Sequence, residues 1–149
     1  MNYYLKYPIN LDIDALLKSN INMLPKNKVS HKEKALLILH TLICFMENAK
    51  QESRYIKTSK YCSLSSSLLK LAMYNYSHYL NFLIIAGVIE TDNAYKVGAK
   101  CKGYCFADAY NVFDYKTYAV TQDALKKGIT RLHQKLNFVY LKNIKKYSF

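Results

Sequence analysis

Residues 63–110 decide the fold, and they read SLSSSLLKLAMYNYSHYLNFLIIAGVIETDNAYKVGAKCKGYCFADAY. Ser65 suits the start of a helix, because a serine hydroxyl accepts hydrogen bonds from the free backbone N–H groups of the first turn. The leucine-rich run that follows ends near Tyr74 and Asn75, and asparagine tolerates the backbone angles of a turn. The sequence therefore predicts a short helix that is closed by a turn.

A second helix is predicted directly afterwards, from Tyr76 to Ala86, with Gly87 as its C-terminal cap. At about 100° per residue, its apolar side chains fall into one stripe. The stripe, which we assign to the core, consists of Tyr76, Leu80, Leu83 and Ile84. The opposite face, which we expect to be exposed, carries His78, Asn81, Phe82 and Ile85.

A two-stranded hairpin completes the stretch. Residues 88–90 begin an extended segment, and residues 104–106 return as its partner strand. The loop between Gly98 and Gly103 is too long for a two-residue turn and carries lysines at its tip. Residues 61–63, which precede the first helix, are predicted to add a small strand to this hairpin.

This order of helix 65–74, helix 76–86 and hairpin GVIETDNAYKVGAKCKGYCF resembles the winged helix-turn-helix superfamily. The resemblance covers about residues 32–110 and is greatest to winged-helix domains of phage and plasmid replication or regulatory proteins. It implies an α+β, mostly helical fold with a small antiparallel β-hairpin wing. It also implies that the second helix enters the major groove of DNA while the wing contacts the backbone.

The resemblance, together with side-chain chemistry, selects ten candidate DNA contacts. Asparagine can read adenine, while lysines and helix N-termini suit phosphates. The phosphate-binding candidates are Lys57, Lys60, Lys70, Lys96, Lys100 and Lys102. The candidates at or near the second helix are Asn75, Ser77, His78 and Asn81.

The rest of the chain adds elements on both sides of this unit. Residues 1–7 read as an extended edge segment and residues 11–17 as a brief helix. Ser30 and Glu33 fit a capping box, and the helix that follows is apolar on nearly every face over residues 35–46, which predicts burial on most sides.

A final strand and a long helix are predicted after the hairpin, at 115–120 and from Thr121 to about Lys146. The helix has an apolar stripe at spacings of four and three. The stripe consists of Leu125, Ile129, Leu132, Leu136 and Val139. Three interpretations remain open: packing on its own domain over Phe82 and Ile85, pairing with a second copy, or a basic arm on DNA. The predicted division is an N-terminal extension (1–29), a winged-helix domain (30–120) and a basic C-terminal helix (121–149).

The net charge is +12, from 22 basic and 10 acidic residues. Such a balance favours polyanionic partners. No apolar run is long enough for a membrane span, and no signal peptide is apparent. The composition is rich in lysine, tyrosine and asparagine, which AT-rich codons encode. We therefore expect a cytoplasmic protein of a bacterium, its phage or its plasmid.

No enzyme, cofactor or metal site is predicted. P-loop, dinucleotide-binding, GxSxG and HExxH motifs are absent from the sequence. Cys101 and Cys105 do not complete a usual zinc spacing. Cys44 lies in the apolar helix and is interpreted as a small core residue. His40 lies in the same run, and because nothing nearby completes a site we interpret it as a satisfied core histidine.

The predicted function is binding of duplex DNA in replication initiation or transcriptional regulation. The alternative is a winged helix that contacts protein, as adaptor or homodimer, through the C-terminal helix or through Phe82 and Ile85. A weaker alternative is a basic module for RNA or single-stranded DNA that stacks bases on tyrosines.

Overall fold

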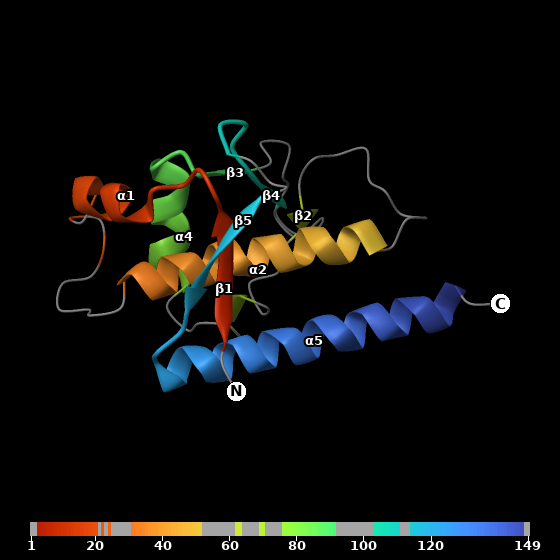
Figure 1. The fold of residues 1–149 in the computed structure, drawn as a ribbon. Coiled ribbons are helices and arrows are strands. Elements are labelled where there is room, and N and C mark those ends of the chain that lie inside the picture. The colour runs from red at the N-terminus through yellow and green to blue at the C-terminus, as the bar shows by residue number, and fades with distance from the viewer. Residues whose placement is uncertain are drawn as a thin grey trace.

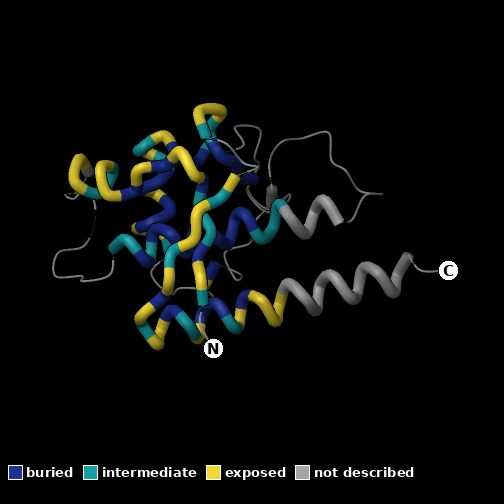
Figure 2. The backbone as a smooth tube through the Cα atoms, viewed as in Figure 1, coloured by how far each residue is buried: buried dark blue, intermediate teal, exposed yellow. Residues whose placement is uncertain are grey.

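Helix α2 (His31–Gln51) is the centre of the fold, and every other described element is arranged around it (Figure 1). Its apolar side chains are buried on several faces, as the sequence predicts, and Figure 2 shows the middle of this helix in the colours of buried and half-buried residues. The described apolar residues of α2 with no exposed surface are Ala35, Leu36, Leu37, Ile38, Leu39, Leu42 and Ile43. Removing this much apolar surface from water is the largest favourable contribution to folding.

The computed structural model describes residues 3–20, 22, 24, 31–51, 62–63, 69–70, 76–91, 103–110 and 114–147, and for 20, 47–51, 62–63 and 136–147 it describes the backbone alone. Within these ranges the chain is an α+β fold, mostly helical, with two small antiparallel sheets. Side chains from the N-terminal segment, the central part and the last helix share one buried cluster.

The first sheet joins the two ends of the chain. Strand β1 (Tyr4–Pro8) pairs antiparallel with β5 (Tyr115–Ala119), and Leu5 lies opposite Tyr118. The ribbon crosses over α2 (Figure 1), and Leu5 points into the core with no exposed surface. Strand β5 lies within the predicted strand 115–120, and β1 confirms the predicted extended segment 1–7 but runs one residue further, to Pro8.

The second sheet has the strand order β2-β4-β3. Strand β4 (Gly103–Phe106) lies in the middle and is buried along its whole length, between β2 (Cys62–Ser63) and β3 (Ile89–Thr91). The hairpin and the added strand before it are therefore confirmed. The loop that joins β3 to β4, with the predicted wing tip, lies outside the described residues.

Two more helices flank α2. Helix α1 (Ile13–Asn20) confirms the predicted brief helix, and α5 (Asp123–Tyr147) runs beside α2 in the same direction (Figure 1). The first three members of the predicted stripe of α5 are buried, namely Leu125, Ile129 and Leu132. The interpretation that α5 packs on its own domain is therefore correct for this half of the helix. The part of the interpretation that has α5 covering Ile85 is wrong, because Ile85 is 68% exposed.

A buried hydrogen bond fixes the junction between β5 and α5 against the start of α2. The Thr121 hydroxyl donates to Glu33 Oε1 over 2.8 Å, and the Glu33 carboxylate is almost fully buried. Glu33 lies in the first turn of α2, where the helix dipole stabilises a negative charge. A residue predicted to cap the helix therefore also holds the far end of the chain.

Helix α4 (Tyr76–Ile85) is capped as predicted by Gly87, whose φ of +81° lies in the left-handed region. The Val88 amide donates to the Leu83 carbonyl, and the Gly87 amide donates to the Ile84 carbonyl. These two bonds form a Schellman motif, which satisfies carbonyl groups at the helix end.

We expect Gly87→Ala to lower the free energy of unfolding by about 1–2 kcal/mol, because an L-residue with a Cβ resists this backbone angle. A Cβ at this position would meet no atom within 4 Å, so the cost is conformational. Gly87→Asn should cost less, since asparagine tolerates the left-handed region. Urea denaturation of the three proteins measures the order, and an alanine variant as stable as the parent would contradict it.

None of the described helices combines the length and the apolar character that crossing a membrane requires.

Candidate functional site

Helix α4 presents one continuous polar face to solvent. Ser77, His78 and Asn81 are exposed, as predicted, and Ile85 extends the same face by one turn. At 100° per residue these four side chains span an arc of about 100°. Three of the four can donate or accept hydrogen bonds at the edge of a base or at a phosphate.

The opposite face of α4 shows that one prediction is wrong. Phe82 was predicted to be exposed, but it has no exposed surface. The four buried residues of α4 are Tyr79, Leu80, Phe82 and Leu83. The buried face is therefore rotated by roughly 60° from the predicted stripe. Tyr76 and Ile84, which were assigned to the core, lie at its margin and are half-buried.

A polar partner explains how Tyr79 can occupy the core. Its hydroxyl lies 2.9 Å from Nδ1 of His31, at the start of α2. A buried hydroxyl needs such a partner, and burial raises the pKa of Tyr79. This hydrogen bond joins residues that are 48 positions apart, so no local pattern in the sequence indicates it.

The other predicted contacts divide into two groups. Lys70 is exposed, as a phosphate contact requires. The remaining six residues lie outside the described parts of the chain, namely Lys57, Lys60, Asn75, Lys96, Lys100 and Lys102. The structure thus brings Ser77, His78 and Asn81 together on one face.

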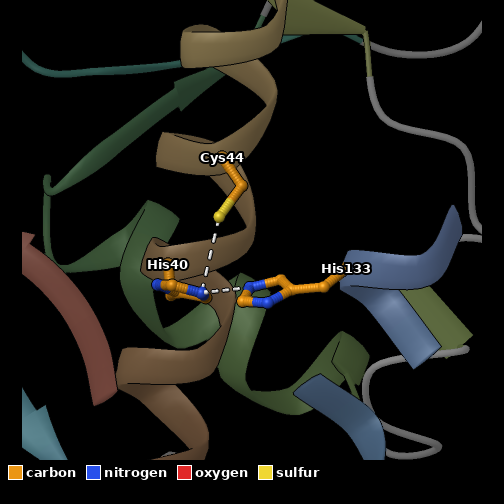
Figure 3. Close-up of side chains that lie close together, drawn as sticks. All are labelled: His40, Cys44 and His133. Atoms are coloured by element: carbon orange, nitrogen blue, oxygen red, sulfur yellow. Dashed lines mark hydrogen bonds between the residues drawn. The ribbon is translucent and has the colours of Figure 1, made fainter. Parts of the chain in front are cut away.

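A second group of polar side chains lies between α2 and α5, and the sequence did not predict it. His40 Nε2 lies 3.2 Å from His133 Nε2 and 3.4 Å from Cys44 Sγ. Figure 3 shows the two imidazoles pointing toward one another from different helices, with the thiol above them. One ligand atom from each of the three residues lies within 4.8 Å of the others.

The surroundings of His40 keep its ring neutral. The ring is 3% exposed, and its Nδ1 accepts a hydrogen bond of 3.0 Å from the backbone N–H of Lys6 in β1. Burial, followed by the nearby charges of His133 and Lys6, lowers the pKa of His40 to about 3. Since Nδ1 accepts, the ring proton lies on Nε2 and is directed at His133 and Cys44.

His133 is more exposed than His40, yet its pKa is lowered as well. Burial of the ring edge and then the charge of Lys6 lower the pKa of His133. Its Nε2 accepts from His40, so its own proton lies on Nδ1. Both rings are therefore neutral near pH 7, the form in which histidine binds metal ions.

The prediction that His40 is a core residue is confirmed, but the assumption that no ligand lies near it is wrong. His40 and Cys44 are four residues apart, which places them on the same face of a helix. That spacing was the available signal. No such signal in the sequence indicated His133. It follows 93 residues after His40 and approaches it only because α5 packs on α2.

Comparison of the chain with protein-family models, with curated proteins and with solved structures found no match.

Proposed function

We propose that this protein binds duplex DNA through a winged-helix arrangement in which α4 enters the major groove. The observation that carries the proposal is the exposed polar face of α4, which is followed directly by an antiparallel ribbon. The sheet order β2-β4-β3 supports it, because a strand that precedes α4 in the sequence pairs with the hairpin that follows α4. Of the predicted helix 65–74, only residues 69–70 are among the described residues, and they are helical. The net charge of +12 supplies the attraction to a polyanion.

In this proposal the lysines neutralise phosphates while α4 reads bases. Asn81 lies in the middle of the exposed face, where its amide can bond to N6 and N7 of adenine. Ser77 and His78 lie one turn earlier, at the end of the helix that favours negative groups. Exposed cations on α5, at Lys127, Arg131 and Lys135, add to the positive surface of the protein. The setting is cytoplasmic, in phage or plasmid replication initiation or transcriptional control.

Selection from a random duplex pool, followed by fluorescence anisotropy, tests the proposal. We expect an enriched sequence and an affinity that falls by several orders of magnitude between 50 and 200 mM salt if about 6–10 phosphates are contacted. No enrichment together with salt-insensitive binding would refute duplex recognition. Preference for a single-stranded competitor would instead favour the base-stacking alternative.

On the selected duplex we expect Asn81→Ala to weaken binding by about 1–3 kcal/mol, that is, roughly 5- to 150-fold, and to relax the preference for one base pair. Gln134→Ala, which removes an exposed amide from α5, is the matched control and should leave the affinity unchanged. Equal effects of the two substitutions would show that α4 does not read bases.

A second candidate function is contact with protein, and the exposed Ile85 favours it. Phe82 no longer contributes to this alternative, because it is buried. Light scattering after size exclusion, with the parent and Ile85→Asp, separates the two functions. A dimer that Ile85→Asp breaks while DNA affinity is retained would favour protein contact.

A further inference from the structure

The polar group between α2 and α5 has the composition and spacing of a metal centre. It offers one thiol and two imidazoles, from His40, Cys44 and His133, at the junction of two helices (Figure 3). We propose that these three side chains form a zinc site that joins α5 to α2. The site is independent of DNA binding and uses none of the residues assigned to it.

Two of the three distances between ligand atoms are close to those around a tetrahedral zinc ion. With zinc about 2.0–2.1 Å from nitrogen and about 2.3 Å from sulfur, neighbouring ligand atoms lie roughly 3.3–3.6 Å apart. The distances from His40 Nε2 are 3.2 Å to His133 Nε2 and 3.4 Å to Cys44 Sγ. Cys44 Sγ and His133 Nε2 lie within 4.8 Å of one another, and a small rotation of the exposed His133 side chain would bring them to the same spacing. One position remains for water or another ligand.

The chemistry of the donors selects the ion. Thiolate and imidazole favour zinc and its neighbours in the transition series, whereas magnesium and calcium require oxygen ligands. Thiolate is the form of cysteine that binds metal ions, so binding removes the proton of the Cys44 thiol. One proton is released for each ion bound, and affinity rises with pH. The Lys6 ammonium opposes a cation, but its flexible stem allows it to move toward solvent.

His40 must exchange its ring proton for the ion. In the metal-free arrangement Nε2 carries the proton and Nδ1 accepts from the Lys6 amide. Zinc on Nε2 moves that proton to Nδ1, where it faces the N–H of Lys6, and the bond to β1 breaks. The loss of one amide bond is small beside the free energy with which a structural zinc site is formed. Zinc binding is therefore predicted to loosen β1 at Lys6 while it fixes α5.

Titration with Co²⁺, a spectroscopic substitute for Zn²⁺, tests the site on the full chain without an affinity tag. We expect one equivalent to give a thiolate-to-cobalt charge-transfer band and the intense d–d bands of tetrahedral coordination. Added Zn²⁺ should abolish both. The melting temperature should rise with Zn²⁺ concentration, since the ion binds the folded state.

Two pairs of variants assign the ligands. Cys44→Ser should abolish the charge-transfer band, and His133→Gln should weaken binding at least tenfold. Cys101→Ser and His78→Gln, which remove a thiol and an imidazole outside the proposed site, should change neither. A band that survives Cys44→Ser, or equal binding by His133→Gln, would overturn the proposal.

The amide of Lys6 provides a readout that needs no variant. In ¹⁵N-labelled protein, Zn²⁺ should shift the Lys6 amide resonance and accelerate its hydrogen exchange, while the His40 ring nitrogens report the exchanged proton. The amide of Asp14, in α1, is the internal control. Binding that leaves Lys6 and the His40 ring unchanged would show that His40 is not a ligand and would overturn the three-residue site.

Discussion

Phe82→Ala is expected to lower the free energy of unfolding by about 3–5 kcal/mol, because Phe82 is fully buried on α4 and a truncated core phenylalanine leaves a cavity. Domains of this size are stable by only about 5–15 kcal/mol, so the loss is a large part of the total. Helix α4 packs against α2, and the cavity opens inside the shared core. Urea denaturation followed by circular dichroism measures the change.

Ile85→Ala is the matched control, three residues further along the same helix. Ile85 is 68% exposed, and truncation of an exposed side chain changes stability by no more than about 0.5 kcal/mol. If Ile85→Ala proved the more damaging change, Ile85 and not Phe82 would lie on the buried face of α4. The polar face proposed to read DNA would then be turned away from solvent.

The contrast between these two residues shows what the sequence can predict about α4. Its bounds, its Gly87 cap and the strand after it follow from local chemistry, because a glycine at positive φ and an alternating pattern act over a few residues. The rotation of α4 about its own axis does not follow from local chemistry. A helix with apolar residues at Tyr79, Leu80, Phe82 and Leu83 as well as at Tyr76 and Ile84 has two competing faces. The observed face is the one that allows Tyr79 to bond to His31, and this bond is not local in the sequence.

The last helix shows the same division. Leu125, Ile129 and Leu132 recur at helical spacing, and all three are buried as predicted. The partner of the stripe was left open among its own domain, a second copy and DNA, because spacing identifies a face but not what covers it. Only the packing of α5 on α2 shows the partner, and only that packing brings His133 to His40.

The metal-free protein, kept so by a chelator, is expected to lose about 2 kcal/mol of stability through His40 between pH 8 and pH 5. In the unfolded chain this histidine titrates near 6.5, whereas burial lowers its pKa to about 3 in the folded state. Between those values the unfolded state binds the extra proton, so stability is complete above about pH 6.5 and falls as the pH falls toward 3. His133, whose pKa is also lowered, acts in the same direction.

His40→Gln separates this effect from the titration of carboxylates. Glutamine cannot titrate, and its side-chain oxygen can still accept from the Lys6 amide that His40 binds. The difference in unfolding free energy between parent and variant should therefore shrink by about 2 kcal/mol from pH 8 to pH 5, because carboxylate effects cancel. If this difference stayed constant with pH, His40 would be protonated in the folded protein as readily as in the unfolded chain. That outcome requires water at the junction of α2 and α5, and the ring would then be free to present Nε2 to solvent instead of to His133.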